Sequence, residues 1–312
     1  MKTFGYLLMA VMACMTCSCR DEEPLPNPVP PVMEPENPGN PEEPDTGKVY
    51  IGIAPIIENM QEQRAVVENW KEGHCLGVTA AGDVNIPFTF DGRRWKAGKQ
   101  VEVTAEQKVS AYYPYNVQYT DMTAIPVDIT TQEDYMYGEG GVSVEKPSAV
   151  LVMKHALSLV RILIKKNDYT GDGRVDAVTF GGVRLSASMD VTSGKLLPTG
   201  QPGEYKAGGN YTLDDASPVY VEAILMPVGT AEGITVNVHV DGRDFTYALP
   251  PTHVWNPGMI YTYTLNMKSG YNCEVDVDHV PMDEEYWSTF GKTDRIVMRD
   301  CGTDRIYIWP NY

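Results

Sequence analysis

The sequence has few basic residues for its size. Its 312 residues carry 25 Lys and Arg side chains against 42 Asp and Glu, which gives a formal net charge of −17 at pH 7. A nucleic-acid-binding protein needs a basic surface to neutralise phosphates, so this composition argues against a nucleic-acid partner. Apolar residues make up 43% of the chain, enough for at least one substantial core, which excludes global disorder.

The known sequence signatures of catalysis are also missing. There is no Gly-x-Ser-x-Gly motif, no phosphate-binding Gly-x-x-x-x-Gly-Lys-Ser/Thr motif, and no His-Glu-x-x-His motif. His74 beside Cys75 is too isolated for a metal site, which needs three or four ligands. The segment Asp168–Gly173 resembles a calcium loop, but the twelfth position is Thr179 instead of glutamate, and a turn explains the same residues. We therefore expect no enzymatic activity, no cofactor and no metal.

The first nineteen residues predict a bacterial export signal. Lys2 precedes an apolar run, Phe4 to Ala13, that is too short to span a bilayer, and small residues and cysteines follow. The end of this segment resembles a lipoprotein signal, in which Cys19 becomes the first mature residue and carries the lipid that anchors the protein to the outer membrane. Cys14 and Cys17 could each be the acceptor instead, although both lie nearer to the apolar run.

Residues 20–47 predict an extended acidic linker. Between residues 20 and 46 there are eight acidic residues, one arginine and nine prolines. The prolines prevent both helix and ladder formation, and the acidic side chains repel one another. The acidic cluster Asp21–Glu23 resembles a signal that sends some bacterial lipoproteins to the cell surface, and a solvated linker is the alternative reading.

From Lys48 onward the pattern is typical of β-strands. Segments 234–240 and 259–267 alternate apolar and polar side chains, as strands with one buried face do. Asp241-Gly242 separates two apolar runs and predicts a tight hairpin. The apolar run from Ala149 to Ile164 fits a strand or a helix by period alone, and its second half favours a strand buried on both faces.

A series of short motifs falls in one order between residues 48 and 267. They are Gln63-Arg64-Ala65, Trp70–Gly73 with Gly77-Val78, Trp95, Ala111–Tyr115, Asp134–Tyr137, Lys154–Ser158, and Trp255–Gly258 before Tyr261–Tyr263. In order and spacing this series resembles the fimbrillin-like family, the Bacteroidetes pilins and pilus-associated lipoproteins. The resemblance implies an all-β fold with two tandem transthyretin-like β-sandwich domains, at residues 48–146 and 147–268. Gly138–Gly141 is a candidate flexible joint near their boundary.

The same resemblance implies a surface fimbrial subunit, or a tip or anchor component, that acts in adhesion. In these pilins an extracellular trypsin-like protease cuts after an arginine that follows the first strand, and the matching bond here is Arg64–Ala65. The loss of residues 20–64 would remove the lipid, the linker and the strand Lys48–Ile57. A strand from a neighbouring subunit could then fill the open groove. The implied partners are other fimbrial subunits, outer-membrane lipid through Cys19 before cutting, and a host or bacterial surface receptor.

The C-terminal tail, residues 269–312, leaves several uses open. Its apolar-alternating pieces Ile296–Met298 and Ile306–Trp309 could supply the exchanged strand or close the chain's own second sandwich, and its aromatic side chains could serve adhesion. Cys273 and Cys301 could form a disulfide in an oxidising exterior, which would leave Cys75 unpaired. The alternative function is a lipid-anchored glycan-binding protein that serves an outer-membrane sugar importer.

Overall fold

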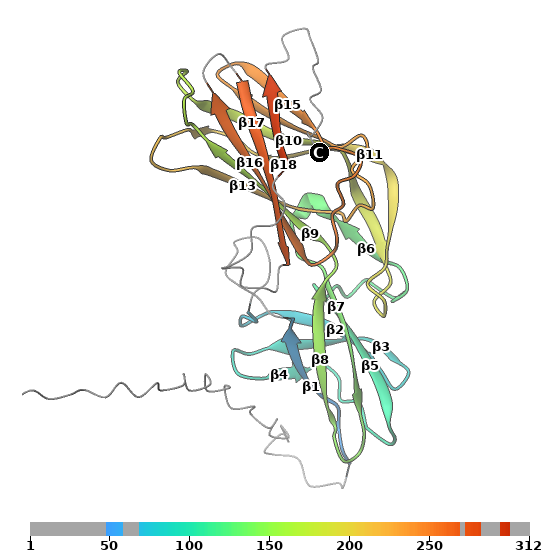
Figure 1. Ribbon diagram of the computed structural model, residues 1–312. Helices are drawn as coiled ribbons and strands as arrows, with labels where there is room; N and C mark the ends of the chain where they lie inside the picture. Colours follow the sequence, from blue (N-terminus) through green and yellow to red (C-terminus); the bar gives the residue numbers. More distant parts are fainter. Residues whose placement is uncertain (1–47, 59–68, 269–271, 282–293, 300–312) are drawn as a thin grey trace, which may run out of the picture. The chain divides into compact units, whose positions relative to one another are not determined.

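The computed structural model describes residues 48–58 and 69–268, together with the backbone of the strands at 272–281 and 294–299 (Figure 1). All of these residues belong to one compact unit, Asn37–Tyr312. The expected export signal, Cys19 and the acidic linker fall outside the described residues. Within the described part of the chain, no helix is long and apolar enough to cross a membrane.

Strands and one short 3-10 turn, η1 (Ile129–Thr131), make up the regular structure of the described residues, which confirms the expected all-β fold class. The first of three sheets has seven strands in the order β1-β8-β7-β5-β2-β3-β4. They are β1 (Gly52–Ile57), β2 (Cys75–Ala80), β3 (Asp83–Phe90), β4 (Trp95–Ala97), β5 (Gln107–Tyr113), β7 (Met136–Val142) and β8 (Ser148–His155).

The other two sheets are formed mostly by the second half of the chain. The second sheet follows the order β11-β10-β14-β15, with β6 and β12 paired to β10, and the third follows β13-β9-β16-β17-β18. The strands of the second are β6 (Ile125–Asp128), β10 (Arg174–Met189), β11 (Leu196–Gly208), β12 (Tyr211–Thr212), β14 (Thr235–Val240) and β15 (Arg243–Ala248). Those of the third are β9 (Ser158–Lys165), β13 (Val219–Leu225), β16 (Met259–Lys268), β17 (Asn272–Pro281) and β18 (Asp294–Arg299).

Alternating side chains build two hydrophobic clusters. The smaller cluster gathers inward residues of the first sheet, among them Leu76, Phe88 and Leu151. The larger one contains buried residues of the second and third sheets, including Val238 of β14 and Tyr263 of β16. Both β14 and β16 show the predicted alternation between buried and half-buried residues, which confirms that each has one fully buried face.

The apolar run 149–164 forms two strands in different sheets. β8 alternates strictly between inward and outward residues, whereas β9 is buried at all but three positions. Between them the backbone leaves the first sheet, because the Ala156 N–H donates to the Tyr135 carbonyl and the Leu157 carbonyl accepts from the Gly258 N–H. The boundary expected between residues 146 and 147 falls just before β8, which still pairs within the first sheet.

Gly138–Gly141 is not a flexible joint, because it lies inside β7. A Cβ atom on Gly138 would lie 2.5 Å from the Val152 carbonyl oxygen, and one on Gly140 would lie 2.5 Å from that of Val150. These distances are too short for any side chain, so the glycines are required for the close approach of β7 and β8. The sequence analysis interpreted these glycines as a source of flexibility, whereas in the structure they allow β7 and β8 to pack closely.

The chain passes between the sheets more than once. β5 belongs to the first sheet, the next strand β6 pairs with β10 of the second, and β7 returns to the first. The turn after β6 is fixed to the third sheet by Gln132, whose side-chain amide donates to the carbonyl of Ile224 at 3.1 Å and accepts from its N–H at 2.8 Å. At the later passage, His155 and Asp134 form a buried pair with 2.9 Å between Nδ1 and Oδ2.

The predicted hairpin at Asp241-Gly242 is present, and it also organises the segment that resembled a calcium loop. Both residues have positive φ, 49° and 76°, as the tight turn between β14 and β15 requires. The Asp241 carboxylate accepts hydrogen bonds from the N–H groups of Gly173 and Arg174, at 2.9 and 2.8 Å, and from the Tyr169 hydroxyl at 2.8 Å. The loop is therefore held by one carboxylate of a neighbouring turn.

We predict that Asp241→Gly destabilises the protein by about 1–2 kcal/mol, because the carboxylate hydrogen bonds are lost while glycine keeps the positive φ. Burial opposes ionisation of Asp241, but the hydrogen bonds from Gly173, Arg174 and Tyr169 outweigh it and lower the pKa of this carboxyl. A lowered folded-state pKa contributes stability that is present above the usual aspartate pKa and is lost as pH falls through the lowered value.

Urea unfolding at pH 7 and at pH 3 measures both effects. The free-energy difference between wild type and Asp241→Gly should shrink at the lower pH. A difference that is the same at both pH values would contradict the assignment to the carboxylate.

Candidate functional site

β1 is an end strand of the first sheet, but the chain immediately before it also forms backbone hydrogen bonds on the side away from β8. Along its length it pairs in parallel with β8, from Gly52 opposite Ser148 to Ile57 opposite Met153 (Figure 1). Just before β1 the chain pairs on its other side, where Val103 N–H donates to the Val49 carbonyl at 2.7 Å and Ile51 N–H donates to the Val101 carbonyl at 2.9 Å. The segment 48–58 therefore closes a gap between β8 and residues 101–103.

Alternate side chains of this segment face the core. Ile51 and Ile53 are each only 7% exposed and belong to the smaller cluster, and Pro55 is buried as well. The residues between them point outward, and Ile56 is 55% exposed. Full burial of an isoleucine side chain contributes about 1.5–3 kcal/mol, so the inward positions fasten the strand mainly through apolar contact.

The backbone of β1 also alternates between its two sides. Gly52 N–H donates to the Pro147 carbonyl and Glu58 N–H to the Met153 carbonyl, each at 3.0 Å. In a parallel ladder every second residue faces the same neighbour, so the even-numbered residues of β1 face β8 and Pro55 faces away from it. Proline fits there because the ladder with β8 needs no N–H at this position.

Trp70 provides the partner for the backbone of Pro55. Its indole N–H donates to the Pro55 carbonyl at 3.0 Å. Trp70 is itself held in place by neighbouring rings, with 5.1 Å between its centroid and that of Trp95 and 5.8 Å to that of Tyr113, both in edge-to-face contact. His74 completes the cluster, and burial, followed by the charge of Lys71, lowers the pKa of its imidazole.

Three of these rings appear in the motif series, but the sequence did not predict that they would cluster around Trp70. Trp70, Trp95 and Tyr113 pack against the smaller hydrophobic cluster and come from separate parts of the chain. The Trp70–Pro55 contact joins residues fifteen apart, a spacing that corresponds to no helical or strand period. The one available signal was a tryptophan soon after the candidate cleavage position.

The outer face of β8 carries exposed apolar side chains next to β1. Val150 is 49% exposed and Val152 is 40% exposed. In register they lie opposite Ala54 and Ile56, respectively. We call Val150 and Val152 the β8 stripe. Ala54 is too small to cover Val150, which lies opposite it.

The predicted site residues divide between described and undescribed parts of the chain. Cys19, Arg64, Ala65 and Cys301 lie outside the described residues. Cys273 belongs to β17 and lies opposite Met298 of β18, so Ile296–Met298 is a strand of the chain's own third sheet. The Cys273–Cys301 disulfide stays a prediction, as do the lipid on Cys19 and the cut at Arg64–Ala65.

Cys75 and the histidines do not form a metal site in the described part of the chain, where no cluster of three or more His, Cys, Asp or Glu side chains could hold a metal ion. Cys75 is half-buried and its Sγ accepts from the Thr89 hydroxyl at 3.5 Å. Burial raises the pKa of its thiol, which makes Cys75 a poor nucleophile at neutral pH.

Comparison with known proteins gives one family and a fold. A family model described as fimbrillin-like matches residues 64–278. No curated protein matches the chain. A candidate cell adhesion protein from Bacteroides uniformis is 20% identical at a TM-score of 0.61, with 76% of this chain and 99% of that chain covered. Another from Bacteroides ovatus is 17% identical at a TM-score of 0.58, with 78% and 99% covered. At these identities the likeness shows the fold alone.

We predict that Ile53 and Ile56 of β1 respond very differently to the same substitution. Ile53→Ser should destabilise the full chain by about 2–4 kcal/mol, because it leaves a cavity and places a hydroxyl in the core. Ile56→Ser should change the free energy of unfolding by less than about 0.5 kcal/mol, because its side chain is largely exposed. Urea unfolding followed by tryptophan fluorescence measures both, and equal effects would contradict the inward packing of β1.

Proposed function

The chain belongs to the fimbrillin-like family, and from this premise we propose that it is a surface subunit of a fimbria, or its tip or anchor component, assembled by strand exchange after β1 is removed. Family membership supports a structural role in fimbriae or adhesion at the cell surface. Within that role we propose that the two hydrophobic clusters correspond to two tandem transthyretin-like sandwiches, and that Cys19 holds the precursor on the outer membrane by its lipid.

The placement of β1 is the observation that carries this proposal. Its contacts run to β8, to residues 101–103 and to Trp70, all of which follow Arg64 in the chain. A cut after Arg64 would therefore separate β1 from the rest without removing any of these neighbours. The residues matched by the family model begin at Arg64 and do not include β1.

A removed strand would leave an acceptor groove, which we define as the edge of β8 from Pro147 to Met153, the backbone of Val101 and Val103, and the indole of Trp70. These groups offer unpaired donors and acceptors beside an apolar floor once β1 is absent. A strand from another subunit satisfies both requirements at once, since main-chain hydrogen bonds hold it and alternate side chains fill the floor.

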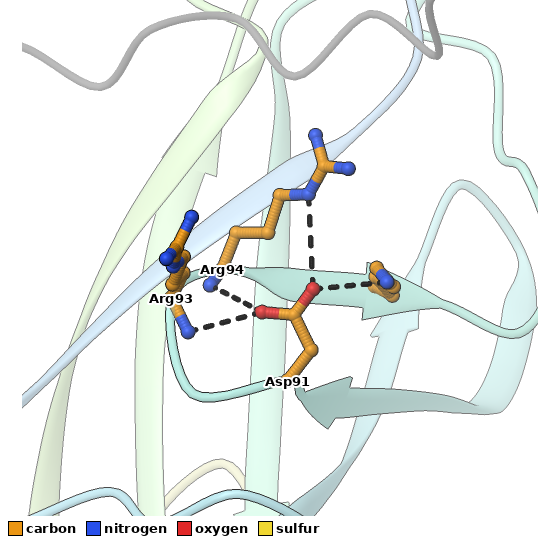
Figure 2. Close-up of polar contacts among 4 residues, drawn as sticks. Asp91, Arg93 and Arg94 are labelled. Atoms are coloured by element: carbon orange, nitrogen blue, oxygen red, sulfur yellow. Dashed lines mark hydrogen bonds and ion pairs between the residues drawn. The ribbon is translucent and has the colours of Figure 1, made fainter.

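The pair Arg93-Arg94 is an alternative target for a trypsin-like protease. Arg93 and Arg94 lie in the exposed turn between β3 and β4, and Figure 2 shows how the Asp91 carboxylate holds that turn. Asp91 Oδ1 accepts from the N–H groups of Arg93 and Arg94 at 3.0 and 2.9 Å, and Oδ2 lies 2.9 Å from Lys96 Nζ. These contacts, the Arg94 N–H first among them, hold the pKa of Asp91 far below its usual range.

A protease binds its substrate as an extended segment, and a turn closed by its own carboxylate must open before it can be cut. The Asp91 turn is also closed by a backbone hydrogen bond from Asp91 N–H to the Arg94 carbonyl at 3.0 Å. We therefore place the functional cut at Arg64 rather than at the Arg93-Arg94 pair.

The glycan-binding alternative has less support from the described residues. It calls for exposed tryptophan rings arranged as a platform for sugars. Trp70 and Trp95 are half-buried and pack edge to face, and Trp255 is 1% exposed. In the described part of the chain the tryptophans therefore serve the cores.

We predict that a trypsin-like protease cuts the purified precursor after Arg64 first, and that Arg64→Ala prevents both this cut and polymer formation. Mass spectrometry of the new N-terminus and electron microscopy of the product measure the two steps. Loss of residues 20–64 from fibres sheared off cells would indicate a shaft or tip subunit, whereas a retained lipid would indicate an anchor.

The Asp91 turn provides matched controls for this cut. Arg93→Ala should leave the rate of the first cut unchanged, and Asp91→Ala should add a cut after Arg93 or Arg94 because the turn loses its closing carboxylate. Normal cutting and normal polymers from Arg64→Ala would contradict the proposal.

A further inference from the structure

The last strand of the first sheet, β4, carries a surplus of positive charge. Between positions 91 and 99, β4 and its flanking turns contain four basic residues and one acidic residue, Asp91. The whole chain, in contrast, has a formal net charge of −17. We call the side chains of Arg93, Arg94, Lys96 and Lys99 the basic edge. A basic surface on an acidic protein attracts acidic partners.

Asp91 does not neutralise this surface. Its Oδ2 lies 2.9 Å from Lys96 Nζ and 3.8 Å from Arg94 Nε, so two cations share one carboxylate (Figure 2). The side chains of Arg94 and Lys96 remain 51% and 59% exposed. Each can therefore bind a second carboxylate without leaving the first.

The other two cations of the basic edge add to the surplus. Arg93 is exposed, and its side chain forms no ion pair with any described residue. Lys99 Nζ lies 2.6 Å from Asp83 Oδ1, and the lysine side chain is 61% exposed. In the neighbouring turn, Lys71 and Glu72 offset each other in charge. Four cations against two carboxylates leave a net charge of +2 at the basic edge.

An aromatic surface lies beside these charges. Trp95 of β4 is half-buried, with 5.3 Å between its ring centroid and that of Phe90. β4 ends the first sheet, and in the described part of the chain no strand pairs with its outer edge. Extended proline-rich segments bind proteins at aromatic surfaces of this kind. The basic edge therefore suits a partner that is acidic, extended and rich in proline.

Residues 34–45 of the linker have this character. They contain five acidic residues, four prolines and no basic residue. The prolines fall at every third position, 35, 38, 41 and 44. A polyproline II helix has three residues per turn, so the four prolines would lie on one face and all five carboxylates on the other two. This spacing separates a surface for aromatic rings from a surface for cations.

We propose that residues 34–45 bind along the basic edge of the same chain as a polyproline II segment. The prolines pack against Trp95, and the carboxylates pair with the exposed cations of the basic edge. The linker enters the folded part close by, because Lys48 Nζ lies 2.9 Å from Oε2 of Glu102, which follows the basic edge in the chain. At about 3.1 Å per residue the segment extends about 37 Å, long enough to follow residues 93–99, which span at most about 25 Å.

The covalent connection favours this segment over that of a second copy. A short tether gives the segment an effective concentration in the millimolar range, so contacts too weak to hold a separate chain are sufficient. The inference goes beyond the proposed function, because it does not need the cut after Arg64. Its effect on reach rests on the proposed lipid at Cys19, since only residues 20–33 would then separate the membrane from the folded part.

Carbodiimide cross-linking of the uncut chain tests this contact, because the reagent joins a carboxylate to a lysine amine only where the two touch. An equal mixture of unlabelled and isotope-labelled chains distinguishes links within one chain from links between copies. We expect links from residues 34–45 to Lys96 or Lys99 within one chain, about fivefold more frequent than links to Lys108, an exposed lysine of β5. Sodium chloride at about 0.5 M should reduce them severalfold. The link between Asp83 and Lys99 provides the internal standard.

Substitutions in the linker test the proline face without altering the folded part. Pro38→Gly combined with Pro41→Gly keeps every charge and should lower the yield of these links about threefold, because the segment loses its preformed polyproline II geometry. Pro26→Gly combined with Pro28→Gly, outside the segment, should leave the yield unchanged.

Three results would overturn the inference. Links mainly between labelled and unlabelled chains would make a second copy the occupant. Equal yields at Lys99 and Lys108 would mean that the linker has no preferred site. An unchanged yield from the variant at Pro38 and Pro41 would remove the proline face from the contact. None of these results bears on strand exchange, which cut chains report through polymer formation.

Discussion

The backbone hydrogen bonds of one strand determine how the first sheet is completed. An edge strand needs partners for its N–H and carbonyl groups, and β1 meets that need on both sides, from β8 on one and from residues 101–103 and Trp70 on the other. Without a strand in this place, the edge of β8 and residues 101–103 would lose these hydrogen-bond partners. Pro55 lies at one of the positions that face away from β8, where the ladder needs no N–H donor.

The inward and outward side chains of this segment differ in character. Among the inward residues, Ile51 and Ile53 belong to the smaller hydrophobic cluster. Pro55 is buried as well, and its carbonyl accepts the hydrogen bond from the Trp70 indole. The outward side chains are different, since Ala54 is small and Val150 opposite it stays half exposed.

Much of the fold could be predicted where the signal is local. Alternation predicted β14 and β16, and Asp241-Gly242 predicted the hairpin between β14 and β15, because side-chain period and turn chemistry are properties of neighbouring residues. Long-range relations could not be predicted in this way. Nothing in the residues 149–164 shows that Ala156 and Leu157 leave one sheet for another, because that depends on partners such as Tyr135 and Gly258. The contact between Trp70 and Pro55 is of the same kind.

The passage of β6 to the second sheet, and of β7 back again, has a mechanical consequence. Together with the step from β8 to β9, it gives three covalent crossings between the first sheet and the others, reinforced by the Gln132 and Asp134–His155 contacts. A tensile load applied to the chain at one core is shared among three parallel strands of backbone rather than concentrated in a single tether. Separation of the first sheet from the others is therefore opposed by three stretches of backbone instead of one.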